Sequence, residues 1–190
     1  MKSPLDILDW ATLDEATRDA VLRRPVQRDA AGLLERARSI VADVRARGDE
    51  ALREYTARFD DVHLQSFAVS DAEFAAAEAV LTPVQRAALE RAIDTITRFH
   101  ELQTLPPLRL ETAPGVVCER ITVALKSVGL YVPAGTAPLP STALMLAVPA
   151  SIAGCPVRVM CTPPRPDGSA DPAVLVAARL CGVRKVFKVG

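Results

Sequence analysis

The sequence predicts an α/β protein in which helices and a β-hairpin precede a βαβαβ unit, half of a doubly wound parallel sheet. Three observations predict this class. Apolar residues recur at helical spacing as far as Leu102, and they alternate with polar residues from Leu108. Short apolar runs then alternate with helix signals up to Val189.

Capping residues predict where the helices of the amino-terminal half begin and end. Gly48 is suited to end one helix, and Asp49 to cap the next. Ser70 and Glu73 have the spacing of a capping box, and Pro83 stands at the favoured first position of a helix. The predicted helices span about residues 13–23, 29–47, 71–80 and 83–102, and a further helix follows its cap Asp49 and includes Phe59. The side chains expected to be buried are Leu33, Leu34, Ala37, Ile40, Val41 and Val44 of the helix over 29–47, then Leu52, Tyr55 and Phe59, and later Ala88, Ile93, Ile96 and Phe99.

The carboxyl-terminal half reads as strands. Two alternating runs separated by Pro114 and Gly115 predict a hairpin. Asp171, followed by a proline, is expected to cap the last helix, and Pro149 to kink or split the helix before it. The predicted strands span 108–112, 116–123, 127–132, 157–162 and 185–189, and the intervening helices 141–153 and 172–181. Two helices cannot cover both faces of three parallel strands, so the sheet is expected to be cut or completed by another chain.

Composition limits the classes of function. Lys and Arg number 23 and Asp and Glu also 23, which argues against a nucleic-acid or anionic-membrane surface. Aromatic residues make up 4%, too few for a platform that stacks bases. The first ten residues contain acidic side chains where a signal peptide needs an apolar core, and the longest apolar run is too short for a membrane span. The expected location is the cytoplasm.

The segment from Ser127 to Ala147 is the strongest candidate for a binding site. An apolar strand ends in a loop of Pro, Gly, Ala and Thr, which leads to a helix with Ser141 or Thr142 as its expected cap. Such loops allow close approach of a nucleotide, but the segment lacks a complete GxGxxG, and an ordinary βα connection explains it as well. Tyr131 lies where ligands bind in doubly wound sheets, or it simply packs against the helix.

Other reactive side chains have structural explanations. Cys118, Cys155, Cys161 and Cys181 form no CxxC pair and are expected to be buried, reduced thiols. The two histidines, His63 and His100, are expected at the surface, and the sequence offers no set of zinc ligands. Glu50 and Glu54 lie one helical turn apart, but a solvated face shared with Arg53 and Arg58 explains them better than a catalytic pair.

Six motifs follow one another along the chain. They are residues 47–60 (RGDEALREYTARFD), Leu105-Pro-Pro, Pro114-Gly-Val, residues 127–139 (SVGLYVPAGTAPL), residues 141–155 (STALMLAVPASIAGC) and residues 180–190 (LCGVRKVFKVG). In this order they resemble segments of the histidinol dehydrogenase family. The resemblance runs from about Ile7 to Gly190. The chain departs from the family at Ala134, where Pro-Gly-Gly is usual.

The resemblance implies an aldehyde-dehydrogenase-like fold and the oxidation of L-histidinol to L-histidine by two hydride transfers to NAD. It maps a cofactor contact onto Tyr131, with Pro133, Gly135 and Thr136 as neighbours. It also implies a homodimer and a zinc ion that holds the substrate. The zinc ligands, the catalytic His and the catalytic Glu have no match in this chain and are expected beyond residue 190.

The implied organisation is an arm over 1–27, an incomplete helical domain over 28–125 and the start of a Rossmann-like NAD-binding domain over 126–190. The chain is expected to lack turnover alone. The alternatives are a non-catalytic module that binds NAD or a partner, and the remnant of an interrupted gene.

Overall fold

The computed structural model describes residues 7–22, 30–134 and 137–190. Packing divides the chain into two compact units, residues 1–46 and 47–190. Among the described residues, no helix has the length and apolar character needed to cross a bilayer. The first unit contains a short 3-10 helix, Trp10–Thr12, the helix α1, Glu15–Leu22, and most of α2, Ala30–Arg47.

The first helix starts two residues later than predicted because Asp14 caps it. The Asp14 carboxylate accepts a hydrogen bond of 2.7 Å from the backbone N–H of Thr17. The guanidinium of Arg18 lies 5.4 Å from the centre of the Trp10 ring and donates to the Trp10 carbonyl at 3.2 Å. These contacts hold the 3-10 helix against the first turns of α1.

Three helices open the second unit: α3, Asp49–Phe59, α4, Asp71–Val80, and α5, Pro83–Glu101. The capping box of Ser70 and Glu73 is confirmed, and Thr82 and Gln85 form a second one that starts α5. The predicted cap of α3 is wrong. Asp49 is already the first helical residue, and Gly48, with φ of 61°, occupies the position before it.

The predicted buried sides of the helices are partly wrong. In α2 the predicted apolar face is largely exposed, with Leu33, Leu34 and Val41 at 59%, 51% and 50%. In α3 the buried residues are Ala51 and Thr56, whereas Phe59 is 61% exposed and stacks on Tyr55. In α5 Phe99 is 64% exposed. The side chains of α5 that pack against the core are Leu89, Ala92, Ile93 and Ile96, and Ala88 is exposed.

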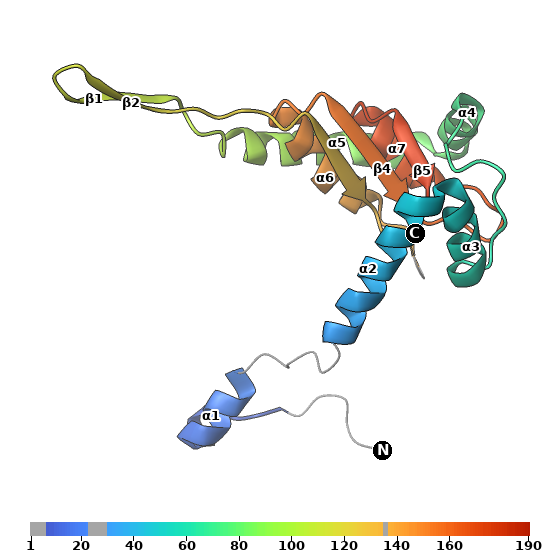
Figure 1. The fold of residues 1–190 in the computed structure, drawn as a ribbon, viewed down its shortest axis with the longest axis horizontal. Coiled ribbons are helices and arrows are strands. Elements are labelled where there is room, and N and C mark those ends of the chain that lie inside the picture. Colours follow the sequence, from blue (N-terminus) through green and yellow to red (C-terminus); the bar gives the residue numbers. More distant parts are fainter. Residues whose placement is uncertain (1–6, 23–29, 135–136) are drawn as a thin grey trace. The chain divides into compact units, whose positions relative to one another are not determined.

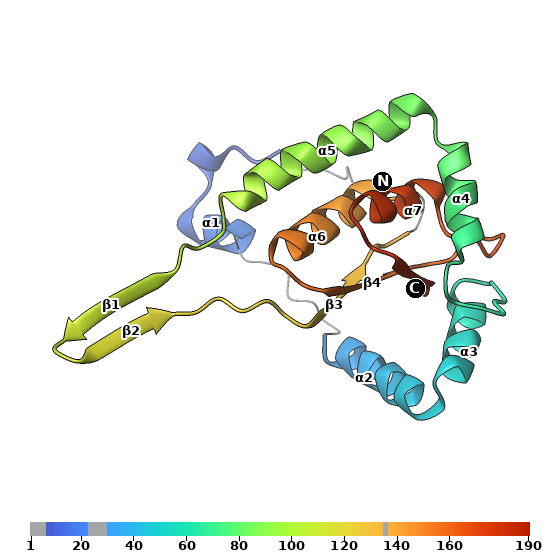
Figure 2. The same ribbon diagram turned by 90° about the horizontal axis from the view of Figure 1, so that it is seen from above.

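The predicted hairpin is confirmed. Strand β1, Leu108–Ala113, pairs antiparallel with β2, Val116–Arg120, and Gly115 in the turn has φ of 78°. Every residue of both strands is exposed, and the hairpin lies away from the parallel sheet (Figures 1 and 2). The second strand ends at Arg120 rather than at the predicted Val123.

The predicted βαβαβ unit is also confirmed. The strands β3, Ser127–Tyr131, β4, Val157–Thr162, and β5, Lys185–Lys188, form a parallel sheet in the order β3-β4-β5. The connecting helices are α6, Pro140–Ile152, and α7, Pro172–Leu180. Asp171 caps α7 as predicted, because its carboxylate accepts from the N–H groups of Ala173 and Val174.

Both connecting helices cover the same face of the sheet. Helix α6 packs on α7, α5 packs on α6, and α4 packs on α7, so a second helical layer lies outside the first (Figure 2). The core lies between these helices and the sheet, with Leu144, Met160 and Val174 at most 1% exposed. Side chains on the opposite face stay partly open, since Val157 is 40% and Tyr131 52% exposed.

The outer edge of β5 is protected by an earlier segment of the chain. The N–H of Val69 donates to the carbonyl of Val186 at 2.9 Å, and the N–H of Lys188 donates to that of Phe67 at 2.8 Å. Phe67 packs with Val62 and Leu64 in a small second core. This segment therefore covers one exposed edge of the parallel sheet.

Candidate functional site

The carboxyl ends of the three parallel strands gather the chain's candidate binding residues at one edge. Tyr131 is the last residue of β3, and it lies in register with Cys161 of the central strand. The next residue, Val132, is fully buried, and its N–H donates to the Cys161 carbonyl at 2.9 Å. Tyr131, by contrast, is 52% exposed, so its ring is available to a ligand rather than packed against a helix.

The loop after Tyr131 contains the other predicted residues. Pro133 is exposed and Ala134 half-buried, whereas Gly135 and Thr136 lie outside the described residues. Ala134 is not among the non-glycine residues with a positive φ. Its methyl group therefore does not strain the backbone.

The predicted cap of α6 is wrong. The helix begins at Pro140 rather than Ser141, and the N-cap position is Leu139, which makes no side-chain capping bond. Proline has a φ already suited to the first helical position, and this moves the start one residue earlier. Ser141 and Thr142 therefore lie inside the first turn, where the N–H of Thr142 donates to the Leu139 carbonyl at 3.0 Å. Pro149 lies within α6, which continues past it to Ile152.

The central strand ends at Thr162, which sequence reasoning did not single out. Its side chain is fully buried, and among the described groups its Oγ1 has no hydrogen-bond partner. An unpaired buried hydroxyl costs about 1–3 kcal/mol. A buried polar atom left unpaired at a ligand-binding edge is a candidate positioning group for that ligand.

Asp60 is a second candidate site residue that sequence reasoning missed. It follows the last turn of α3, and its N–H donates to the carbonyl of Thr56 at 3.0 Å. A Cβ built on Gly190, just past β5, would lie 3.2 Å from each carboxylate oxygen of Asp60. Burial raises the pKa of Asp60 above its usual value. Only the fold could reveal this contact, because the two residues lie at opposite ends of the second unit's sequence.

The cysteines do not form a reactive site. All four thiols are free, and Cys118 is exposed on the hairpin, contrary to the expectation that it would be buried. Burial raises the pKa of the Cys181 thiol to about 11, although the nearby Arg158 opposes part of that effect. Burial likewise raises the pKa of Cys161. Neither thiol is therefore a strong nucleophile at neutral pH.

The histidines and the glutamate of the predicted carboxylate pair that lies beside Arg47 show no catalytic arrangement. His100 Nδ1 lies 2.8 Å from Gln103 Oε1, and His63 is exposed in the segment after α3. Glu54 accepts two hydrogen bonds of 2.9 Å from Arg47, which makes it one half of a surface ion pair. Within the described part of the chain, no group of three His, Cys, Asp or Glu side chains could hold a metal ion. These residues do not fit a zinc site.

Comparisons with known proteins agree on one family. The family model described as histidinol dehydrogenase matches residues 23–190. Histidinol dehydrogenase of Xanthomonas euvesicatoria is 60% identical over 186 residues, which is 98% of this chain and 43% of that protein. The Xylella fastidiosa enzyme is 50% identical over the same length. A crystal structure of histidinol dehydrogenase from Elizabethkingia anophelis matches with a TM-score of 0.87 and 35% identity, over 94% of this chain and 41% of that one.

Proposed function

The chain belongs to the histidinol dehydrogenase family, and from this membership we propose that it forms part of an enzyme that oxidises L-histidinol to L-histidine with two NAD⁺. The reaction would be the last step of histidine biosynthesis. The chain spans about 43% of the length of the relatives it matches, so we place the catalytic groups in the remaining part of a longer protein. The role proposed for residues 1–190 is to hold the cofactor.

The exposed ring of Tyr131, at the carboxyl edge of the parallel sheet, is the observation that supports this role. Tyr131, Pro133, Gly135 and Thr136 would hold NAD⁺, and the small residues would let the backbone approach it closely. The aromatic ring can stack on a flat heterocycle, because it is 52% exposed before any ligand arrives. When bound, NAD⁺ would accept a hydride from the substrate.

We expect Tyr131→Ala to weaken NAD⁺ binding about fivefold, because stacking of aromatic rings contributes about 1 kcal/mol. Tyr131→Phe should retain most of the affinity, because it keeps the ring. The measurement is calorimetric titration of NAD⁺ into the 190-residue chain. The chain's second tyrosine provides the control, since Tyr55→Phe changes a residue on α3 that stacks on Phe59. Equal NAD⁺ affinities for the wild type and Tyr131→Ala would show that the ring is not part of the binding site.

We expect the 190-residue chain alone to form no NADH from histidinol above a no-enzyme control. The physical reason is that the described residues offer no metal cluster to orient the alcohol. The assay follows NADH absorbance with L-histidinol, NAD⁺ and zinc present, and a full-length relative serves as the positive control. Turnover by the chain alone would show that the catalytic groups lie within it.

The zinc ion, the homodimer and the cytoplasmic location remain proposals that follow from family membership. The described residues do not fit the zinc ion, so we place its ligands in the remaining part of the longer protein. The proposed organisation remains an arm over 1–27, a first domain over 28–125 and the start of the NAD-binding domain over 126–190.

A further inference from the structure

Three basic side chains line one hollow at the amino ends of β4 and β5, the opposite ends of the strands from Tyr131. The hollow has a volume of about 220 Å³ and no acidic residue in its lining. The residues that line it are Pro156, Val157, Arg158, Gly182, Arg184 and Lys185. The hollow therefore concentrates positive charge in a chain whose formal net charge is zero.

The cations of this hollow are not neutralised within the described part of the chain. Arg158 Nη1 is itself buried and has no hydrogen-bond partner among the described groups. Among the residues that the structure describes, no carboxylate forms an ion pair with Arg158, Arg184 or Lys185, whereas nearby Arg179 has one. A buried guanidinium N–H without an acceptor is unfavourable, and the like charges around it repel one another. An anion in the hollow would relieve the repulsion among the three cations.

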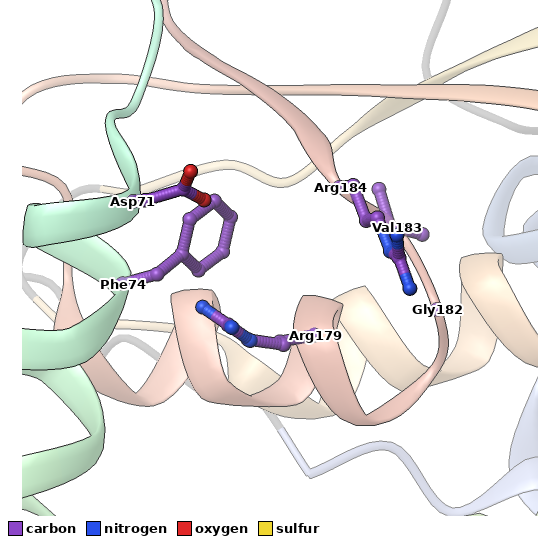
Figure 3. Close-up of a pocket in the computed structure, with 6 residues that line it drawn as sticks. All are labelled: Asp71, Phe74, Arg179, Gly182, Val183 and Arg184. Carbon is purple, nitrogen blue, oxygen red and sulfur yellow. The ribbon is translucent and has the colours of Figure 1, made fainter.

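A neighbouring hollow differs because its own arginine is paired with a carboxylate. It has a volume of about 420 Å³ and shares Gly182 and Arg184 with the first (Figure 3). Its other arginine, Arg179, lies 3.4 Å from a Glu78 carboxylate oxygen and 5.4 Å from the centre of the Phe74 ring. Asp71 lies across this hollow from Arg184 (Figure 3), and no ion pair joins them. The unbalanced charge therefore lies on the side of Arg158, Arg184 and Lys185.

Backbone geometry lets Arg158 lie close to the loop before β5. Gly182 has φ of 74°, and a Cβ built on it would lie 3.3 Å from Arg158 Nη2. A side chain at this position would be strained in its backbone and would crowd the guanidinium. The glycine that follows α7 thus leaves room for the guanidinium beside the hollow.

We propose that this hollow binds a small phosphate-type oxyanion. The planar guanidinium groups of Arg158 and Arg184 present paired N–H donors that match phosphate oxygens, and the Lys185 ammonium adds a third charge. The ligand can be inorganic phosphate or the phosphate group of a small ester, and both offer the same oxygens. This site is independent of the NAD⁺ site proposed above, because it rests on residues at the other ends of the strands.

The test is a titration of the 190-residue chain with inorganic phosphate at constant ionic strength, followed by thermal unfolding and by amide chemical shifts. We expect saturable binding, which Arg158→Gln and Arg184→Gln should each weaken about tenfold. The matched control is Arg98→Gln, which removes an exposed arginine paired with Asp94 on α5 and should leave phosphate affinity unchanged. A parallel titration with glycerol phosphate distinguishes a preference for an ester from a preference for the free ion.

Two results would overturn the proposal. One is stabilisation by phosphate no greater than that by chloride at the same ionic strength. The other is unchanged phosphate affinity in Arg184→Gln combined with Lys185→Gln. Arg184 and Lys185 are both exposed, so this double variant should fold. It keeps the test decisive even if Arg158→Gln fails to fold.

Discussion

Replacing Glu73 with Gln is expected to lower the free energy of unfolding by about 3 kcal/mol, because it leaves the Lys188 charge buried without a counter-ion. Lys188 Nζ donates to Glu73 Oε1 at 2.7 Å, and the two side chains are only 10% and 29% exposed. The pair joins the first turn of α4 to the last residue of β5. Glutamine still fits the third position of a capping box, so the substitution removes the charge while the cap of Ser70 persists.

The expected loss can be checked by urea unfolding of four proteins: the wild type, Glu73→Gln, Lys188→Met and the double variant. The double variant should regain much of the stability lost in each single one, because no unpaired charge remains buried. Glu78→Gln is the matched control. Its partner Arg179 and Glu78 itself are 46% and 40% exposed, so the change should cost less than about 1 kcal/mol. A loss in Glu73→Gln no larger than in this control would contradict the prediction.

The same pair gives stability a specific pH dependence. Burial alone would raise the pKa of Glu73, but hydrogen bonds from Lys188 and Ser70 outweigh it and hold the pKa below the ordinary value of 4.5. Because the pKa of Glu73 is lower in the folded state, the ion pair contributes its full share to the free energy of unfolding above pH 4.5. That share is lost as the pH falls through the lowered pKa of the folded state. This part of the acid sensitivity should be missing from Glu73→Gln.

Elements whose signals lie within a few residues could be predicted from the sequence. Asp171 before a proline and Ser70 three residues before Glu73 cap their helices as predicted, because these bonds close within one turn. Leu139 shows the limit of such local reasoning. Serine and threonine near a helix start favour the cap position, but Pro140 fixes the first turn and displaces them.

Features that depend on distant segments could not be predicted. Phe59 has the right spacing for a buried stripe, yet Ala51 and Thr56 face the packed side, because neighbouring segments decide which face of an amphipathic helix is covered. The approach of Asp60 to Gly190 and the pairing of Glu73 with Lys188 follow from the fold alone. For the candidate site, the sequence identified the exposed Tyr131 but not Thr162, since a lone threonine at the end of a strand has no distinguishing pattern.

Leu144→Ala is expected to lower the free energy of unfolding by about 3 kcal/mol, through lost burial and the cavity left behind. Leu144 is 1% exposed and belongs to the main core cluster beneath α6. This helix contacts β3, α5 and α7, so a cavity there has little freedom to collapse. For a chain of this length the loss corresponds to a fall in Tm of roughly 6–12 °C.

Two neighbouring substitutions separate the cavity from other effects of mutating α6. Leu144→Met nearly conserves volume and should cost less than about 1.5 kcal/mol. Met145→Ala removes a side chain that is 61% exposed on the same turn and should change stability by less than about 0.5 kcal/mol. Because α6 follows the loop that begins at Pro133, Leu144→Ala should also weaken NAD⁺ binding, whereas Met145→Ala should not. Similar losses of stability in Leu144→Ala and Met145→Ala would mean that α6 does not bury Leu144 against the sheet.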